Sequence, residues 1–243
     1  MKGYRLIDTH THTSGVSLCG RVTCEELIDQ KMALGYEGCI LTNHCQPHYY
    51  APTVENHAAY IEKAIAEYRR ALPYAKERGF VWMLGIEVTI LEPFYSDWQL
   101  YGVTEEFLKA TPCLHALSQR ELFSICEEWG VMLVQAHPWR GNLSYCDDQH
   151  PGEKGFLRGV ELNCSGGDLL NKEKVLATAK EYGVFVTCGT DYHGPEQRFV
   201  GGMFVPDEVH TSVDFATYLK ETTETVIAYN GEILKIPNFS KKV

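Results

Sequence analysis

Histidine and carboxylate side chains recur in this chain directly after short apolar runs. They are His10, His12, His44, Glu87, His137, Asp191 and His193. Imidazole nitrogens and carboxylate oxygens bind zinc, manganese and iron, and an ion held in this way can activate a water molecule. These residue types, in this number, therefore point to metal-assisted hydrolysis.

The elements that would position these side chains are the apolar runs that precede them. The runs cover residues 4–7, 38–41, 80–84, 131–134 and 184–187. Apolar runs of this length are typical of buried strands in a parallel sheet. In an α/β barrel the carboxyl ends of the strands converge on one face. We therefore expect residues scattered from position 10 to position 193 to meet at one polynuclear metal centre.

The sharpest local pattern is His10-Thr11-His12 at the end of the first run. Alternate residues of a strand point to the same side, so both imidazoles can reach one ion. Asp8 lies on that side too and could orient a ligand histidine. Taken alone, the pattern could also be two surface histidines. Its repetition in Asp191-Tyr192-His193 at another strand end favours a metal site.

Helices are expected between the apolar runs. Thr23 with Glu26, and Ser118 with Glu121, match the capping-box pattern that starts a helix. The expected helices cover residues 23–34, 54–78, 118–129, 171–182 and 212–222. The alternation of strand and helix predicts parallel pairing with right-handed crossovers.

Three further segments have a recognisable pattern. Residues 140–158 and 92–99 are rich in turn-forming and polar residues, and we expect both to be loops at the active site. Residues 226–236 are predicted to form a final strand pair, with Asn230-Gly231 as its turn.

The length and composition fit one large α/β domain. The chain has 243 residues, of which 44% are hydrophobic, and α/β barrels commonly contain roughly 250 residues. No linker or internal repeat divides it, so we expect a single domain over residues 1–243. The net charge of −10 without a concentrated basic tract argues against duplex nucleic acid as a partner. It does not exclude a small phosphorylated substrate, because bound metal ions supply positive charge locally.

The apolar stretches are too short to span a bilayer, and no charged-then-apolar secretory segment opens the chain. Nine cysteines without CxxC pairs suit reduced, buried thiols better than a disulfide framework. We therefore expect a cytoplasmic protein without membrane contact. The sequence leaves its oligomeric state open.

The motifs together resemble those of the PHP (polymerase and histidinol phosphatase) domain. The four family motifs occur in order at residues 8–12, 41–44, 135–138 and 189–193, and Gly85-Ile86-Glu87 matches the intervening glutamate. The resemblance covers nearly the whole chain. It implies a distorted (β/α)7 barrel of the TIM-like type, a trinuclear site of zinc, manganese or iron, and phosphoesterase activity.

The same resemblance implies a set of ligands for up to three divalent ions. The first ion would be held by His10, His12, Glu87 and Asp191. Glu87 would bridge to a second ion that also takes His137, and His44 and His193 would hold the third.

Two positions depart from the family pattern. Cys19 lies in the loop where the family often has Asp or His, and Gln99 stands where many members have a histidine before a Leu-Gly pair. Cys19 could bind zinc as a thiolate, or it could be a loop cysteine without a metal role. Gln99 is a weak ligand and could leave a position open to water.

The expected mechanism is attack by a metal-activated hydroxide on a phosphate ester. Two divalent ions lower the pKa of a bridging water from about 15.7 toward roughly 7. Asp191 and His193 are the nearest groups to protonate the leaving alkoxide, although metal ligands are poor acids. Arg140, three residues beyond His137, could grip phosphate oxygens bidentately, or it could be a solvated loop arginine.

The remaining polar residues are weaker candidates. Arg198 and His48 could contact the substrate, and Asn163 could bind either the substrate or a residue behind the ligands. His57 is expected at the surface, and His115 is expected to be structural or solvated.

Four functions compete on this basis. A phosphomonoesterase acting on a small metabolite, similar to histidinol phosphatase, explains the ligands and the charge. A phosphodiesterase or exonuclease acting on nucleotides or short oligonucleotides would use the same centre. A non-catalytic regulatory PHP module has only the changes at Cys19 and Gln99 in its favour. Metal-dependent C–N hydrolysis, with Glu87 as a bridging carboxylate, is the fourth.

Overall fold

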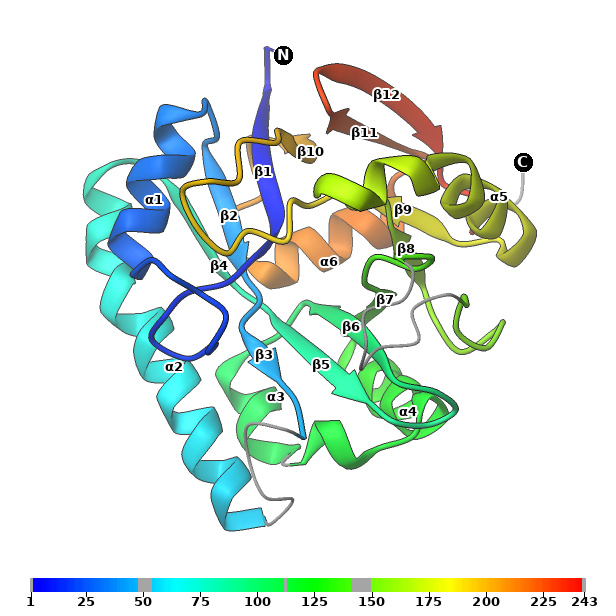
Figure 1. Cartoon of the computed structure of the whole chain (residues 1–243), viewed down its shortest axis with the longest axis horizontal. Coiled ribbons are helices and arrows are strands. Elements are labelled where there is room, and N and C mark those ends of the chain that lie inside the picture. The colour runs from blue at the N-terminus through cyan, green and yellow to red at the C-terminus, as the bar shows by residue number, and fades with distance from the viewer. Residues whose placement is uncertain (1, 48–53, 112, 141–149, 242–243) are drawn as a thin grey trace.

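The computed structural model describes residues 2–47, 54–111, 113–140 and 150–241. Within these ranges the strands form two six-stranded sheets (Figure 1). The first sheet has the order β12 (Glu232–Pro237), β11 (Glu224–Tyr229), β10 (Gly201–Pro206), β1 (Tyr4–Thr11), β2 (Gly38–Leu41) and β4 (Val81–Leu84). The second has the order β3 (His44–Cys45), β5 (Ile86–Ile90), β6 (Ser96–Tyr101), β7 (Met132–Gln135), β8 (Gly159–Glu161) and β9 (Phe185–Thr187).

The expectation of parallel pairing is confirmed only in part. β1, β2 and β4 pair in parallel, as do β7, β8 and β9, but β6 runs antiparallel to both β5 and β7. The expected active-site loop at residues 92–99 is therefore in part a strand, because Ser96–Gln99 belongs to β6. The turn at Glu92-Pro93 reverses the chain, and residues Ile86–Ile90 then find their partners across a hairpin. Mixed pairing of this kind is common in large sheets.

The two sheets are continuous along the chain at two places. β2 continues into β3 after Thr42-Asn43, and β4 continues into β5 after Gly85. A parallel bridge between Thr11, at the end of β1, and Tyr192, after β9, joins the two sheets again. The chain therefore has a mixed α/β fold in which the ends of β1, β3, β5, β7 and β9 approach one region.

Helices lie between the strands largely as predicted. They are α1 (Cys24–Ala33), α2 (Val54–Glu77), α3 (Glu105–Ala110), α4 (Gln119–Trp129), α5 (Lys172–Tyr182) and α6 (Ser212–Glu221). Both predicted capping boxes are present, at Thr23 and at Ser118. The 3₁₀ turns η1 (Leu114–Ala116) and η2 (Gly166–Asn171), the helix α3 and the strand β10 were not predicted. α1 and α2 lie side by side next to β2 and β4 (Figure 1).

The predicted C-terminal strand pair is confirmed. β11 and β12 pair antiparallel from Glu224 to Pro237. Asn230 and Gly231 form the turn with φ values of 48° and 86°. Positive φ at both central positions is what a tight two-residue hairpin requires, and Asn-Gly adopts it readily.

His57 is not at the surface, and this expectation is wrong. Its side chain is fully buried on α2, on the face that also carries Tyr60, Ile61, Ala64 and Ile65. These residues recur at intervals of three and four, which is the spacing of one helix face. The buried face of α2 therefore includes a polar ring among apolar side chains.

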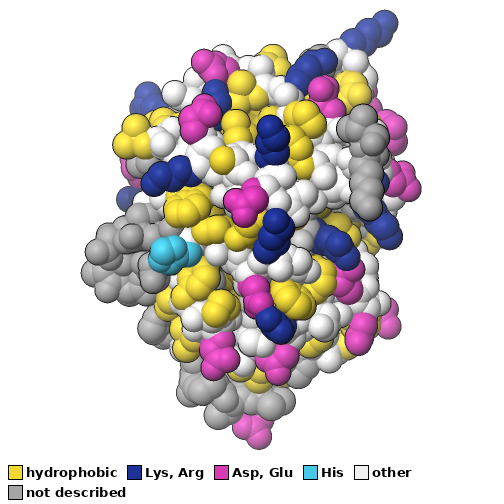
Figure 2. Space-filling view, turned by 90° about the vertical axis from the view of Figure 1, so that its right-hand side faces the viewer, with side chains coloured by type: hydrophobic (Ala, Val, Ile, Leu, Met, Phe, Trp, Pro, Cys, Tyr) yellow, Lys and Arg dark blue, Asp and Glu magenta, His cyan; other side chains and the backbone are white. Residues whose placement is uncertain are grey.

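The burial of the cysteines agrees with the expectation from the composition. All eight cysteines in the described part of the chain are free, and most are buried. Among the described residues, no helix is long and apolar enough to cross a membrane. The face in Figure 2 mixes Lys and Arg with Asp and Glu, and no basic stripe gathers on it.

Candidate metal centre

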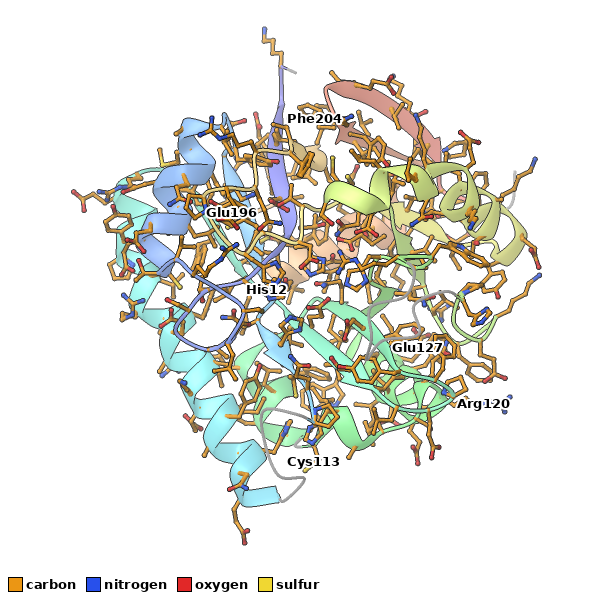
Figure 3. The ribbon with its side chains drawn as sticks, viewed as in Figure 1. His12, Cys113, Arg120, Glu127, Glu196 and Phe204 are labelled. Atoms are coloured by element: carbon orange, nitrogen blue, oxygen red, sulfur yellow. The ribbon has the colours of Figure 1, made fainter. Side chains whose placement is uncertain are left out.

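The predicted ligands meet at the ends of the strands. His10 lies on β1 and His12 follows that strand directly, His44 is the first residue of β3, and Glu87 is the second residue of β5. His137 follows β7 directly, and Asp191 and His193 follow β9. His12 lies near the middle of the molecule beside the end of β1 (Figure 3). Strand ends separated by up to 183 positions in the sequence thus supply one cluster.

The tightest group contains His10, His12 and Asp191. The two Nε2 atoms lie 3.0 Å apart, and Asp191 Oδ1 lies 3.2 Å from His10 Nε2 and 3.1 Å from His12 Nε2. Glu87 adds Oε1 at 3.1 Å from His10 Nε2. Ligand atoms around a tetrahedral zinc ion lie roughly 3.3 Å apart. This spacing fits one divalent ion among the four side chains.

Glu87 connects this group to two others. Its Oε1 lies 3.3 Å from His137 Nε2, and its Oε2 lies 2.8 Å from His44 Nδ1. The side chain is fully buried, and neither of its oxygens has a hydrogen-bond partner of good geometry among the described residues. A buried carboxylate surrounded by ring nitrogens without satisfied hydrogen bonds is expected where metal ions complete the contacts. The site therefore fits divalent metal binding.

A further group of possible ligands lies at the outer side of the cluster. His12, Cys19, His44 and His193 present nitrogen or sulfur atoms that all lie within 4.8 Å of one another. Cys19 and His193 are half-buried, whereas His10 and Glu87 are inaccessible. Burial alone would raise the pKa of Cys19, but hydrogen bonds to His193 and His44 lower it to about 6. A thiolate is the form in which cysteine binds a metal ion.

The negative charge of the buried carboxylates in the inner cluster must be balanced by protonated histidines or by bound metal ions. Burial lowers the pKa of His10, but Glu161 and Glu87 raise it well above its usual value. Burial, with His44 and His193, lowers the pKa of His12. The pKa values of these two neighbouring imidazoles are therefore shifted in opposite directions. A divalent ion can supply the positive charge that the carboxylates otherwise draw from protonated histidine.

Two of the predicted ligands have an unusual backbone. His137 has a φ of 28° and Asp191 a φ of 51°. Residues other than glycine with a positive φ are strained by about 1–3 kcal/mol each, and such residues cluster at functional sites. A glycine at position 189 allows the close approach of β1, since a Cβ there would lie 2.4 Å from the Cβ of His10.

Arg140 reaches the cluster but contacts carboxylates of the protein. Its Nη2 lies 2.6 Å from Asp191 Oδ2 and 2.8 Å from Asp168 Oδ2, and it donates to Ser165 Oγ at 3.2 Å. Its side chain is 16% exposed. The guanidinium thus fixes the oxygen of Asp191 that does not face His10 and His12, and little of it is open to solvent.

Glu161 is a site residue that the sequence analysis did not identify. Its two oxygens lie 2.9 and 3.1 Å from His10 Nδ1. Its Oε2 also accepts hydrogen bonds from the backbone N–H of His137 and from Asn163 Nδ2, both at 3.0 Å. Asn163 therefore lies behind the ligands. Glu161 is the last residue of β8, and the ends of other strands carry proposed ligands. That position was the signal in the sequence that could have identified it.

Asp8 acts differently from the expectation. It accepts hydrogen bonds from the backbone N–H groups of His10 and Thr190, at 3.1 and 3.0 Å, and it pairs with the buried Lys31 at 2.5 Å. It contacts no imidazole ring in these interactions. Asp8 thus anchors the backbone of two ligand-bearing segments to α1.

The other predicted contacts have mixed outcomes. Gln99 does point into the cluster, with Nε2 2.9 Å from His10 Nε2 and with Oε1 buried and without a partner among the described residues. Exchange of the amide oxygen and nitrogen would turn an oxygen ligand toward His10. Arg198 is exposed and lines a pocket with Gln30 of α1 and with Leu34, which follows that helix. His48 and residues 141–149 of the expected loop lie outside the described residues.

Three solved structures are similar to this chain in fold. A two-domain protein from Bacteroides vulgatus, described as containing a predicted PHP-like metal-dependent phosphoesterase, has a TM-score of 0.64 at 15% identity, over 96% of this chain and 67% of that one. A protein from Bifidobacterium adolescentis, named as a metal-dependent phosphoesterase, has a TM-score of 0.53 at 18% identity, over 88% and 94%. The lesion-specific endonuclease PfuEndoQ from Pyrococcus furiosus has a TM-score of 0.55 at 12% identity, over 89% and 56%.

No family model and no curated protein sequence matches the chain. At these identities the similarity shows the fold, which is that of PHP-like metal-dependent phosphoesterases. The similarity confirms the mixed α/β fold with PHP-like neighbours that the sequence motifs led us to expect.

Proposed function

We propose that this chain is a metal-dependent phosphoesterase that hydrolyses a small phosphorylated metabolite, with histidinol-phosphatase-like activity on monoesters. The observation that carries the proposal is the buried Glu87 carboxylate, which has four imidazole nitrogens within 3.3 Å. The proposed ligands of up to three zinc, manganese or iron ions are His10, His12, Cys19, His44, Glu87, His137, Asp191 and His193. The similarity in fold to PHP-like phosphoesterases supports this proposal.

Ions bound in such a cluster activate water and neutralise phosphate oxygens. Several residues of the chain have separable tasks. Glu161 holds the ring of His10 in place, and Arg140 holds Asp191. The side chain of His193 is 23% exposed and that of Asp191 is 8% exposed, so His193 is the better placed of the two candidates to meet a leaving group. Arg140 is proposed to meet a phosphate oxygen with the part of its guanidinium that remains open.

We further propose that the two sheets belong to one distorted (β/α)7 barrel in a single domain. The bridge between Thr11 and Tyr192 supports closure, because it links the end of β1 to the segment after β9. The continuity of β2 with β3 and of β4 with β5 supports it as well.

A nuclease remains the second candidate. The similarity to an endonuclease of known fold favours it, although this chain spans only 56% of that protein. The net charge of −10 and the mixed charges of the face in Figure 2 favour a small substrate instead.

The test combines metal analysis with a substrate panel. Protein purified without chelator is analysed for zinc, manganese and iron, and then assayed on phosphomonoesters, phosphodiesters, short oligonucleotides, amides and lactones. The proposal predicts bound metal and turnover of monoesters above all others, with Glu87→Gln as the inactive control.

Other results would overturn the proposal in defined ways. Turnover of oligonucleotides alone would establish the nuclease. Turnover of amides or lactones alone would establish C–N or related hydrolysis. A cluster that takes up no added zinc, manganese or iron would favour a non-catalytic module.

A further inference from the structure

A second group of metal-binding side chains lies outside the centre described above. It consists of Cys45 on β3, His57 on α2 and His115 on η1. The three side chains are buried, with exposed fractions of 0%, 0% and 2%. None of them takes part in the proposed hydrolysis.

The geometry of the group is close to that of a metal site. Cys45 Sγ lies 3.9 Å from Nδ1 and 4.0 Å from Nε2 of His57, and 3.8 Å from Nδ1 of His115. One nitrogen or sulfur atom from each residue lies within 4.8 Å of the others. In a tetrahedral zinc site, with Zn–S of about 2.3 Å and Zn–N of about 2.0 Å, sulfur and nitrogen ligands lie roughly 3.5 Å apart. The sulfur–nitrogen distances exceed that value by about 0.3–0.5 Å.

Hydrogen bonding explains the group poorly. The sulfur–nitrogen distances are at the outer limit for a thiol hydrogen bond, and a thiol has only one proton to give. The remaining ring nitrogen of His115, Nε2, is buried and has no hydrogen-bond partner among the described residues. An ion held by the sulfur and by one nitrogen of each ring would replace these long contacts with three coordination bonds.

The protonation states of the rings suit a metal ion. Burial, together with His115, lowers the pKa of His57 to about 4. Burial also lowers the pKa of His115. A lowered pKa favours the neutral ring, which keeps a nitrogen lone pair for coordination.

We propose that Cys45, His57 and His115 bind one zinc ion, separate from the hydrolytic centre. One thiolate and two imidazoles are ligands that zinc accepts readily, and three protein ligands leave a fourth position. Cys113 lies two residues before His115 and close enough to act electrostatically on Cys45. In Figure 3 it lies below His12, toward the lower edge of the molecule.

The ion would fasten three segments that are distant in the sequence. One ion would be coordinated by side chains from β3, from the first turns of α2 and from η1. The residue next to Cys45 is His44, a proposed ligand of the hydrolytic centre. The inference goes beyond the proposed function, since it needs no substrate and no turnover.

The test counts ions and identifies their ligands. Zinc per chain is measured by elemental mass spectrometry in the wild type and in Cys45→Ser, His57→Gln and His115→Gln, after equal loading with zinc and gel filtration. Each variant is expected to hold one ion fewer than the wild type. Cobalt-loaded wild type should show a thiolate charge-transfer band that Cys45→Ser reduces and that the matched variant Cys19→Ser retains in part.

Equal zinc content in the wild type and all three variants would overturn the proposal. So would a cobalt thiolate band that is lost completely in Cys19→Ser. If a variant does not fold, as judged by circular dichroism, X-ray absorption on zinc-loaded protein that carries both Glu87→Gln and Cys19→Ser replaces it. That protein should still hold zinc with one sulfur neighbour, and a spectrum with only nitrogen and oxygen neighbours would contradict the site.

Discussion

Glu161 holds the imidazole of His10 through both of its carboxylate oxygens, at 2.9 and 3.1 Å from Nδ1. A carboxylate behind a ligand histidine fixes the ring and raises its basicity, and its loss typically weakens metal binding about 10–100-fold. We expect Glu161→Gln to weaken metal binding to this extent, measured by competition with a chelator of known affinity. The exposed Glu208→Gln is the matched control, and equal affinity in both variants would mean that Glu161 does not position His10.

Glu87 is expected to be indispensable, because it faces nitrogens of four histidines at once. Glu87→Gln keeps the size of the side chain and removes its charge. It should abolish phosphate-ester hydrolysis and remove at least one ion per chain. Elemental analysis and a monoester assay on the same sample check both effects. Full activity in this variant would disprove the assignment of the centre.

Arg140 pairs with both Asp191 and Asp168, and it is also proposed to contact the substrate. Its stabilising role and its substrate-binding role can be tested separately. Removing one partner of a buried ion pair destabilises a protein by about 3–5 kcal/mol, and the 16% exposure of this side chain reduces that value. We expect Arg140→Ala to lower the melting temperature and to raise KM for phosphate esters. Arg140→Lys should restore stability in part, but not KM, since lysine lacks the bidentate fork. A raised KM with unchanged stability would show that substrate contact is its only role.

Lys31 is fully buried beside Asp8, and its ammonium group lies 4.0 Å from the centre of the Tyr192 ring. Lys31→Met leaves the carboxylate of Asp8 without its cation, so we expect a loss of about 3–5 kcal/mol in unfolding free energy. Adding Asp8→Asn should recover part of that loss. Urea unfolding of the metal-free proteins measures both. A single variant as stable as the wild type would show that the pair contributes nothing.

Cys19 should react as a thiolate at unusually low pH when the metal is absent. Burial alone would raise its pKa, but hydrogen bonds to His193 and His44 lower it to about 6. The thiolate fraction, and with it the rate of alkylation, should therefore rise as the pH passes through about 6 and level off above it. Mass spectrometry of iodoacetamide-treated protein follows the modification, and Cys19→Ser is the control. Zinc should protect Cys19 if the thiolate is a ligand, and equal rates with and without zinc would exclude it as one.

The sequence correctly predicted that the proposed inner ligands would meet, because their signal is local. A histidine or acidic residue directly after an apolar run marks a strand end, and strand ends converge in this class of fold. The capping boxes and the Asn230-Gly231 turn are local in the same sense, and the structure has all of them.

The misses depend on contacts between distant segments. β6 is a strand because β5 and β7 both pair with it, and no pattern within residues 92–99 predicts those partners. Glu161 ends a strand of three residues, which is too short to give a clear pattern. His57 was misplaced although the spacing of Tyr60, Ile61 and Ala64 indicated a buried helix face.

β3 consists of His44 and Cys45 alone, and successive strand residues point to opposite sides. His44 faces Glu87, whereas Cys45 faces His57 and His115. Substitutions can therefore damage either cluster separately. Insertion or deletion of one residue before His44 would exchange the two directions and damage both together. This stretch should thus accept changes of residue type during evolution far more readily than changes of length.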